Sequence, residues 1–321
     1  MRVLPPERLE LIDALAAEAG PGGITAGLLE KDEHLTEALR ALFALRPDGM
    51  QLVLCGGTSL SKAHRLIERM SEDADLKVVV SDAILPSKSE VRRCLSDLKA
   101  LVSETLAGVG LVEDKVRGQA FNANHYFCSE WSYGRHYASA ASLRPHLQIE
   151  LTARIPVLKT VTCQVGNLVD LLAGREGTTF DVETVVAAET MAEKVLSFLR
   201  RYAQHRAGLL RQDWDTALVR HLYDVRCIHL QQPDALAEAR QVFPALVAGD
   251  QKEFGTQFAD FAAAAYPVLS GALKQARSDA KIQTEFTSNL LPLIYGGDIP
   301  TFEQSFGDFE TVASAVLETL R

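Results

Sequence analysis

The chain has 321 residues, of which 47% are hydrophobic and 23% are charged, so it can bury a large apolar core. This composition excludes an intrinsically disordered chain, and the absence of any run of about 18 or more apolar residues argues against a transmembrane span. The formal net charge of −9 disfavours a surface covered with phosphate-binding cations, although it permits a local basic patch.

The N-terminal segment MRVLPPERLELIDALAAEAG carries prolines and charges where a signal peptide needs an apolar stretch, so we expect a cytoplasmic protein. The five cysteines are widely spaced and form no CxxC pair, which argues against a zinc site and a disulfide framework. We expect them to be small buried hydrophobic residues: Cys55, Cys94, Cys128, Cys163 and Cys227.

Apolar residues at helical spacing predict helices over 6–45, and RPDGM closes this segment. QLVLC then predicts a buried strand, which Gly56 and Gly57 end. SLSKAHRLIERM (59–70) predicts a helix, and DADLKVVV (73–80) predicts the next strand. Residues 88–108 repeat apolar residues every three or four positions and predict a further helix.

Three strand-like runs follow, at 119–131, 145–154 and 157–165, and NLVDLLAG (167–174) predicts a short helix. Nearly everything after Val182 has helical periodicity. The sequence therefore predicts an N-terminal helical segment (1–45), a mixed α/β domain (46–182) and a helical domain (183–321).

The glycine turn after the first strand is a candidate anion site. Glycine lets a phosphate approach the backbone, and the free N–H groups at a helix N-terminus favour negative charge. Thr58 and Ser59 add hydroxyl groups. Since Ser61 precedes Lys62, the turn is not a Walker A loop. The alternative is a tight turn in which Thr58 or Ser59 caps the helix.

Asp73 and Asp75 are the candidate metal ligands, because alternate residues of a strand point to the same side. Two neighbouring carboxylates repel each other unless a cation lies between them, and Mg²⁺ accepts such ligands together with substrate phosphates. Glu150 is a candidate third ligand. It shares a strand face with Gln148 in HLQIEL, and we expect that strand to be an antiparallel neighbour of 73–80. Two solvated aspartates are the alternative.

Two blocks of sequence resemble the AbiEii/AbiGii-type nucleotidyltransferase toxins, which belong to the DNA polymerase β-like superfamily. The first block matches the family pattern of a Gly-Gly-Thr/Ser turn, a Lys, and Arg-x-Ser-Glu-Asp-x-Asp, with Gly56, Gly57, Thr58, Lys62, Arg69, Ser71, Glu72, Asp73 and Asp75. In the second block, ETMAEKVLSFLRR places Lys194 at the family's active-site lysine. VRHLYDV matches through Arg220, Tyr223 and Asp224, but His221 replaces the family's first aspartate.

This resemblance implies an α+β fold, with a mixed sheet flanked by helices and an all-helical C-terminal domain. It also implies Mg²⁺-dependent transfer of a nucleoside monophosphate from an NTP to an acceptor. In MenT-type members the acceptor is the tRNA 3′ end, and a separately encoded antitoxin controls the toxin. We therefore expect NTP, tRNA and an antitoxin as partners, and neither DNA nor a membrane.

The resemblance also implies a role for each of the matching residues. Asp73, Asp75 and Glu150 would hold the metal, the 56–59 turn and Lys62 would bind the phosphates, and Lys194 would add fixed positive charge. Arg220 and Asp224 lie four residues apart on a helix, so we expect an ion pair that orients Lys194 or the nucleotide.

Basic side chains near the second block are candidate contacts for an RNA backbone: Arg200, Arg201, His205, Arg206, Arg211, Arg220 and Arg226, with Arg92, Arg93 and Lys99 elsewhere. A solvated helix face is the alternative for these residues. Two other functions stay open, namely a nucleotidyltransferase that modifies a protein or small molecule, and a catalytically silent nucleotide-binding regulator.

Overall fold

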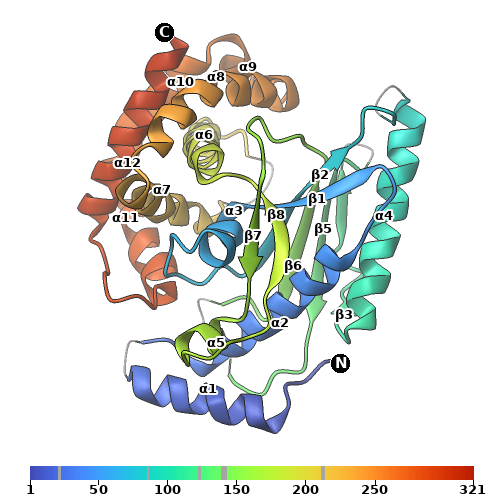
Figure 1. Ribbon diagram of the computed structural model, residues 1–321. Coiled ribbons are helices and arrows are strands. Elements are labelled where there is room, and N and C mark those ends of the chain that lie inside the picture. Colours follow the sequence, from blue (N-terminus) through green and yellow to red (C-terminus); the bar gives the residue numbers. More distant parts are fainter. Residues whose placement is uncertain (21–22, 85–86, 122–123, 139–142, 211–213) are drawn as a thin grey trace. The chain divides into compact units, whose positions relative to one another are not determined.

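The computed structural model describes residues 1–20, 23–84, 87–121, 124–138, 143–210 and 214–321. They form two compact units (Figure 1). The first comprises Met1–Pro156 and Thr160–Val185, and the second comprises Val157–Lys159 and Val186–Arg321. The chain passes into the helical unit directly after Val185.

A mixed sheet forms the centre of the first unit. In the described residues its strands lie in the order β3-β5-β6-β2-β1-β8-β7, with β4 paired to β5. The strands are β1 (Met50–Cys55), β2 (Asp73–Val80), β3 (Val112–Glu113), β4 (Gln119–Phe121), β5 (Tyr126–Ser132), β6 (Leu147–Thr152), β7 (Val161–Val165) and β8 (Phe180–Thr184).

The strand β2 occupies a central position, between β1 and β6. It pairs antiparallel with β1 and parallel with β6, and this register places Asp73 opposite Gln148 and Asp75 opposite Glu150. Alternate residues such as Ala74 and Leu76 are buried, which is the pattern of a strand whose two faces differ. The expected antiparallel pairing of the 145–154 strand with β2 is therefore wrong. Pairing direction depends on the path of the chain between the strands, which local periodicity does not encode.

The helices of the first unit are α1 (Pro6–Ala19), α2 (Ala26–Ala44), α3 (Gly56–Thr58), α4 (Lys88–Gly108) and α5 (Leu168–Leu172). The helix α2 contacts α1, α4, α5, β2 and β8, and thus connects most of the unit. A π-helical turn, Ser59–Ala63, follows α3 directly.

Five consecutive polar residues of α2 are buried, and each contacts a segment distant in sequence: Glu30, Lys31, Asp32, Glu33 and His34. Glu30 accepts the N–H groups of His136 and Tyr137, Lys31 pairs with Glu72, and Asp32 pairs with Lys62. Glu33 pairs with Arg8, and His34 accepts a hydrogen bond from Arg2. Buried charges are tolerated where an opposite charge or a hydrogen bond compensates them. The run EKDEH therefore acts as a polar core that fixes several loops to one helix.

Two sequence-predicted elements differ from the structure. The helix expected over 59–70 ends at Ala63, since Arg65 has φ 55° and continues the chain in a left-handed conformation. The single strand expected over 119–131 is instead two strands, β4 and β5, that pair antiparallel with each other.

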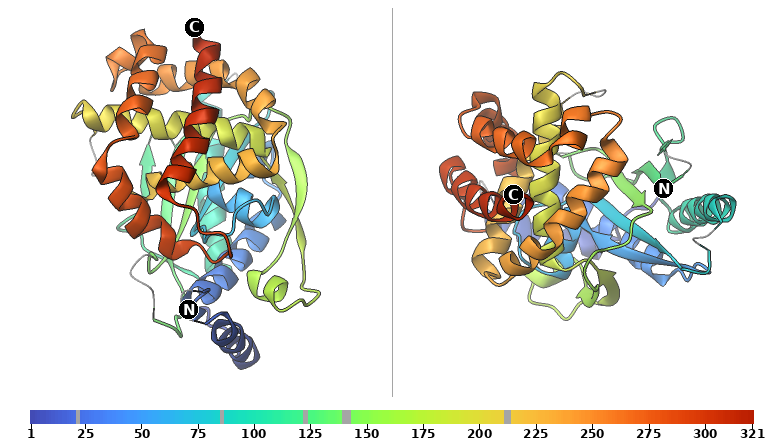
Figure 2. Two further views of the ribbon diagram at one scale, coloured as in Figure 1. Left: turned by 90° about the vertical axis from the view of Figure 1, so that its left-hand side faces the viewer. Right: turned by 90° about the horizontal axis from the view of Figure 1, so that it is seen from above.

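The second unit is helical. It contains α6 (Ala187–Arg206), α7 (Arg220–Gln231), α8 (Ala235–Phe254), α9 (Ala259–Ala263), α10 (Ala265–Ala276), α11 (Ala280–Glu285) and α12 (Phe302–Leu317). Short 3₁₀ segments lie at Thr216–Val219, Leu291–Leu293 and Glu318–Leu320, and a π-helical turn at Phe286–Leu290. Helix α6 packs against α7, α8, α10 and α12 and lies among them in each view (Figures 1 and 2). Phe198 of α6 and Phe309 of α12 meet edge-to-face in this core, with ring centroids 5.1 Å apart.

A mixed sheet with helices, followed by a helical unit, confirms the predicted fold class. Across the described part of the chain, no helix combines the length and the apolar character needed to cross a membrane.

Candidate functional site

The glycine turn packs directly against the carboxylate strand. Gly56 has φ 69°, and a Cβ atom at this position would lie 2.0 Å from Oδ2 of Asp75. A Cβ atom at Gly57 would lie 2.7 Å from Oγ of Ser71 and 2.9 Å from Nη2 of Arg69. Both glycines are therefore needed because their backbones approach neighbouring side chains closely. Gly56 in particular leaves the space that the Asp75 carboxylate occupies.

The hydroxyl groups of the turn are used within the protein. Thr58 donates a hydrogen bond to the main-chain oxygen of Asp73, and its Oγ1 lies 2.9 Å from Oγ of Ser71. Ser59 donates to the main-chain oxygen of Gly56 at 2.9 Å. Thr58 and Ser59 are fully buried. Both hydroxyl groups therefore fix the turn to the start of β2, and their predicted contact with phosphate stays a prediction.

The face of the sheet around β2 carries two rows of polar side chains. Glu130, Gln148 and Asp73 form one row, and Cys128, Glu150 and Asp75 form the next. The sequence analysis predicted that Asp73 and Asp75 share a face and that Gln148 and Glu150 share a face. The parallel register then brings Glu150 level with Asp75. The three predicted metal ligands, Asp73, Asp75 and Glu150, thus lie on the adjacent strands β2 and β6.

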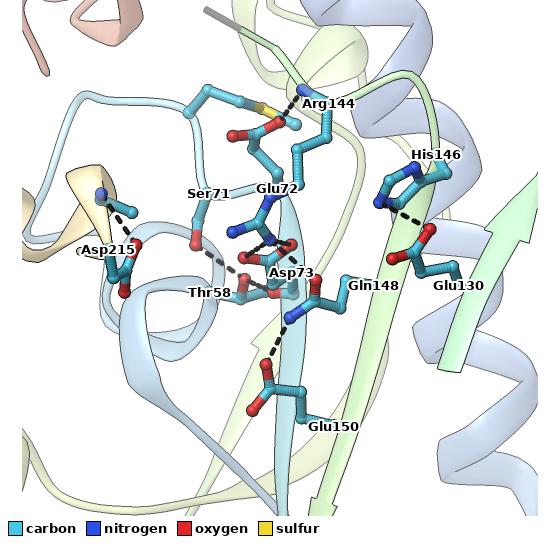
Figure 3. Close-up of polar contacts among 12 residues, drawn as sticks. Thr58, Ser71, Glu72, Asp73, Glu130, Arg144, His146, Gln148, Glu150 and Asp215 are labelled. Atoms are coloured by element: carbon cyan, nitrogen blue, oxygen red, sulfur yellow. Dashed lines mark hydrogen bonds and ion pairs between the residues drawn. The ribbon is translucent and has the colours of Figure 1, made fainter. Parts of the chain in front are cut away.

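Arg144 binds the first of these carboxylates (Figure 3). Its Nη1 atom lies 2.8 Å from Oδ1 and 2.7 Å from Oδ2 of Asp73, and 3.0 Å from Oε1 of Gln148. Gln148 in turn donates to Glu150. Arg144 is therefore a positive partner of Asp73, and it connects with Glu150 through a neutral amide.

The residues beside Asp73 and Arg144 are held by a buried ion pair. Nζ of Lys31 lies 2.7 Å from Oε2 of Glu72, and both side chains are fully buried. The same Glu72 oxygen accepts the main-chain N–H of Arg144 at 2.6 Å, and Lys31 donates to the main-chain oxygen of Arg144 at 2.9 Å. Burial lowers the pKa of Lys31, and the charge of Glu72 opposes this shift. Helix α2 thus fixes both the residue before Asp73 and the backbone of Arg144.

The titration of Glu150 reflects its position next to Asp73. Burial raises the pKa of Glu150, and the negative charge of Asp73 raises it further, while the Gln148 hydrogen bond opposes both effects. Burial also raises the pKa of the neighbouring Cys128 to about 12, with a contribution from Glu150, so this thiol carries its proton at neutral pH. Added positive charge on this face would favour the ionised form of Glu150.

This face has the oxygen donors that Mg²⁺ prefers, which are carboxylates with room for substrate phosphates and water. Asp73 is 20% exposed and is already bound to a cation, the Arg144 guanidinium. Within the described ranges, no three His, Cys, Asp or Glu side chains are gathered closely enough to hold a metal ion. The chemistry of the carboxylate donors nevertheless suits a divalent cation, and Asp73 is paired with the Arg144 guanidinium in this structure.

Lys62, a predicted phosphate ligand, points into the first unit. Its Nζ lies 2.6 Å from Oδ1 of Asp32 and 2.7 Å from Oγ1 of Thr36, both on α2. The side chain is nearly buried. These contacts give Lys62 a structural role, which explains why a charged residue occupies this position. Binding of the nucleotide by Lys62 stays a prediction.

In the second unit, Lys194 and Asp224 form a buried ion pair. Nζ of Lys194 on α6 lies 2.7 Å from Oδ2 of Asp224 on α7, and the Asp224 side chain is fully buried. The sequence analysis named both residues and expected Asp224, paired with Arg220, to orient Lys194 or the nucleotide, and the pairing with Arg220 stays a prediction. Arg220 begins α7 and lies one turn before Asp224. The structure thus assigns to Asp224 a cationic partner that is 30 residues away in sequence (224 − 194).

The predicted RNA-contacting side chains do not form a single free face. Arg200 is buried, with its Nε 3.0 Å from Oδ2 of Asp250 and its guanidinium 3.8 Å from the centroid of Phe254. Arg201 pairs with Asp215, and Arg226 pairs with Asp308. Arg206 is exposed. Arg211 lies outside the described residues.

Sequence reasoning missed Arg144 and Lys31. Arg144 lies between two strands and is 71 residues from Asp73, so no local spacing connects them. Lys31 lies in a charged run that resembles a solvated helix turn, although a run of five polar residues within an otherwise apolar helix was a visible irregularity. The family pattern did contain Glu72, to which Lys31 is bound.

Comparison with known proteins identifies a family match over most of the chain. A family model described as "Nucleotidyl transferase AbiEii toxin, Type IV TA system" matches residues 37–308. Among solved structures, JHP933 from Helicobacter pylori is 11% identical, with a TM-score of 0.42, over 90% of this chain and 93% of that chain. MenT4, a nucleotidyltransferase toxin from Mycobacterium tuberculosis H37Rv, is 18% identical, with a TM-score of 0.37, over 70% of this chain and 72% of that chain. No curated protein matches the chain.

Proposed function

The chain belongs to the AbiEii family of nucleotidyltransferase toxins of type IV toxin–antitoxin systems, and from this premise we propose that it transfers a nucleoside monophosphate from an NTP to the 3′ end of tRNA. The reaction would take place in the cytoplasm, require Mg²⁺ and block translation. A cognate antitoxin would control it. The tRNA acceptor follows from the resemblance of the two motif blocks to MenT-type members.

The observation that best supports this proposal is the contact between the glycine turn and the carboxylate strand. Gly56 leaves space for Asp75, and Thr58 is bonded to the backbone of Asp73. The two motifs, separated in sequence, thus pack directly against each other. A preorganised arrangement of this kind holds charged groups in place without reorganisation during the reaction.

In the proposed reaction, an acceptor hydroxyl oxygen attacks the α-phosphorus of the NTP. A new P–O bond forms, the bond to the bridging oxygen of the β-phosphate breaks, and pyrophosphate leaves. The hydroxyl proton passes to solvent. Asp73, Asp75 and Glu150 would hold Mg²⁺, which when bound neutralises charge on the phosphates and lowers the pKa of the attacking hydroxyl.

The remaining roles belong to protein groups alone. The backbone of the 56–59 turn would donate N–H groups to the phosphates. Lys194 would provide positive charge for the triphosphate, with Asp224 fixing its ammonium group through the 2.7 Å contact. Arg220 would contribute to nucleotide binding. A fixed cation stabilises developing negative charge better than a mobile one, because its position does not have to be reorganised.

The acceptor distinguishes this proposal from its alternatives. The purified protein is incubated with each NTP labelled at the α-phosphate, with Mg²⁺, total tRNA and a protein extract. Label on tRNA supports the proposal, and label on a protein or small molecule shows a nucleotidyltransferase with another acceptor. If NTP binds but no label is transferred, the protein is a silent nucleotide-binding regulator.

A further inference from the structure

Arg144 binds a carboxylate that we propose as a metal ligand. Its Nη1 contacts both oxygens of Asp73, at 2.7 and 2.8 Å, and also Oε1 of Gln148 at 3.0 Å. The same carboxylate oxygens would serve as ligands of a cation. The arginine therefore occupies the Asp73 carboxylate in the described structure.

The backbone and the side chain of Arg144 are held differently. The main-chain N–H and C=O are bonded to Glu72 and Lys31, which form a fully buried ion pair. The side chain is 34% exposed, and it reaches Asp73 across the surface of the site. A long side chain on a fixed backbone can change partners without any movement of the fold.

Electrostatics makes arginine and a divalent cation competitors at Asp73. Both require the same carboxylate oxygens, and like charges at contact distance repel strongly in a partly desolvated site. A cation that reaches Asp73 therefore competes with the Arg144 guanidinium for these oxygens. The fixed backbone then keeps this guanidinium within side-chain reach of Asp73, where the phosphates of a metal-bound nucleotide would lie.

We propose that Arg144 is an exchangeable counter-ion of the carboxylate site: it binds Asp73 until a divalent cation displaces it, and it then binds the phosphates of the nucleoside triphosphate. The proposal rests on the proposed function, because it presumes a metal at Asp73. A guanidinium suits both partners, since its planar N–H groups match a carboxylate or a phosphate. The exchange would couple metal entry to nucleotide capture.

The first measurement concerns the metal alone. Mn²⁺ is titrated into the full-length protein without nucleotide, and free Mn²⁺ is quantified by electron paramagnetic resonance. Removing the competitor in Arg144→Ala should tighten Mn²⁺ binding by about 10-fold, the effect of one charge-assisted contact. Arg144→Gln, which keeps a hydrogen-bond donor but no charge, should tighten binding as well. Arg144→Lys, which keeps the charge but not the planar guanidinium, should lie between wild type and Arg144→Ala.

The second measurement adds a nucleotide that cannot react. At saturating Mn²⁺, the affinity for the α,β-methylene analogues of the four common nucleoside triphosphates is measured by calorimetry. Losing the phosphate contact in Arg144→Ala should weaken the best-bound analogue by about 10-fold. The same variant is thus expected to bind metal more tightly and nucleotide more weakly. A residue with a purely structural role would not produce these opposite changes.

Arg117→Ala is the matched control. It removes another guanidinium that pairs with a sheet carboxylate, because Arg117 Nη1 lies 3.3 Å from Glu130 Oε2 on β5. It should leave both affinities unchanged. Arg144→Ala keeps the main-chain bonds to Glu72 and Lys31, so it should fold. If Arg144→Ala does not fold, the same affinities are measured with Arg144→Gln.

The outcomes separate this inference from the proposed function. Unchanged or weaker Mn²⁺ binding in Arg144→Ala and Arg144→Gln, with normal binding in wild type, overturns the exchange and leaves the proposed function intact. Tighter binding of both metal and nucleotide overturns the phosphate contact. A wild-type protein that binds no Mn²⁺, or binds it equally well after Asp75→Asn, contradicts the metal site itself and this inference with it.

Discussion

Lys194 and Asp224 form a buried ion pair in which the Lys194 ammonium lies 2.7 Å from a fully buried carboxylate. The pair connects α6 to α7 in the core of the helical unit. Both residues come from the sequence block that resembles the family's active-site lysine. The carboxylate therefore fixes the position of the charge that we assign to the triphosphate.

Lys194→Ala should lower the free energy of unfolding as well as activity. It leaves the Asp224 charge buried without its ammonium partner, and breaking a buried ion pair from one side costs about 3–5 kcal/mol. Urea unfolding measures this loss. The double variant Lys194→Met/Asp224→Asn should recover part of the stability but none of the transfer activity. Equal stability of Lys194→Ala and wild type would contradict the structural role.

Asp75→Asn should abolish nucleotidyl transfer while the protein stays folded. Removing a charge that positions a reacting phosphate typically lowers the rate by about 100-fold or more. Asp73→Asn should have a similar effect. The matched control is Asp181→Asn on β8, an exposed carboxylate bonded to Gln164. Transfer by Asp75→Asn at nearly the wild-type rate would remove Asp75 from the site.

Gly56→Ala should damage the site through the contact with Asp75. The substitution combines a left-handed φ of 69° with a Cβ atom that would lie 2.0 Å from the carboxylate. Gly174→Ala is the control, because Gly174 has φ 60° and no atom within 4 Å of the added Cβ. Both variants should lose about 1 kcal/mol from the backbone conformation. Activity should fall in Gly56→Ala alone, and equal activity of both variants would refute a packing role for Gly56.

Arg206→Glu and Arg200→Glu should behave differently if the helical unit binds RNA. Arg206 is exposed, so its reversal should weaken RNA binding and reduce the salt dependence of the affinity at unchanged stability. Arg200 is buried against Asp250, so its reversal places two carboxylates together and should lower the melting temperature. Filter binding at several salt concentrations and thermal melts distinguish the two. Normal RNA affinity and salt slope in Arg206→Glu would point to another acceptor surface.

Stability should decrease in mild acid because of His34. Burial, and then the positive charge of Arg2, lower the pKa of this ring to about 3, and the Arg2 guanidinium donates to Nδ1 at 2.8 Å. An unfolded chain protonates histidine below about pH 6.5, while the folded chain does not. His34 therefore imposes no penalty above about pH 6.5, and stability falls below it by up to about 1.4 kcal/mol per pH unit.

The variant His34→Asn tests this effect. Its absolute stability should be lower, because the stacking of His34 on Tyr133 is lost. The decline in unfolding free energy between neutral and mildly acid pH should nevertheless be shallower than in wild type. Urea unfolding across this pH range gives both slopes. Parallel curves would show that His34 does not contribute to the acid sensitivity.

Local patterns predicted much of the fold. The alternation in 73–80 predicted β2 and the shared face of Asp73 and Asp75, and the spacing in 88–108 predicted α4 at its observed bounds. The end of the expected 59–70 helix was missed, because Arg65 adopts a left-handed conformation that its residue type does not favour. The parallel register of β2 with β6 was also missed, since it depends on contacts far apart in sequence.

The sequence named residues of the candidate site, but it did not indicate which side chains they contact. Asp224 was identified, but its contact with Lys194 on α6 was not indicated by the spacing within its own helix. Lys62 was placed with the phosphates because of the resemblance to the family pattern, and in the structure it contacts Asp32 within the first unit. The spacing of residues along the chain gave no indication that Arg144 and Lys31 belong to the site. A long side chain can contact residues that are far away in sequence, and such contacts become evident only in the folded structure.

The most direct test of the central claim follows the label of an NTP during the reaction. Wild type and Asp75→Asn are incubated with tRNA, Mg²⁺ and the preferred NTP, labelled either at the α-phosphate or at the γ-phosphate. Nucleotidyl transfer predicts that the α-label moves to the tRNA 3′ end, that the γ-label leaves in pyrophosphate, and that Asp75→Asn does neither. Transfer of the γ-label to an acceptor, or equal transfer of the α-label by Asp75→Asn, would contradict the account.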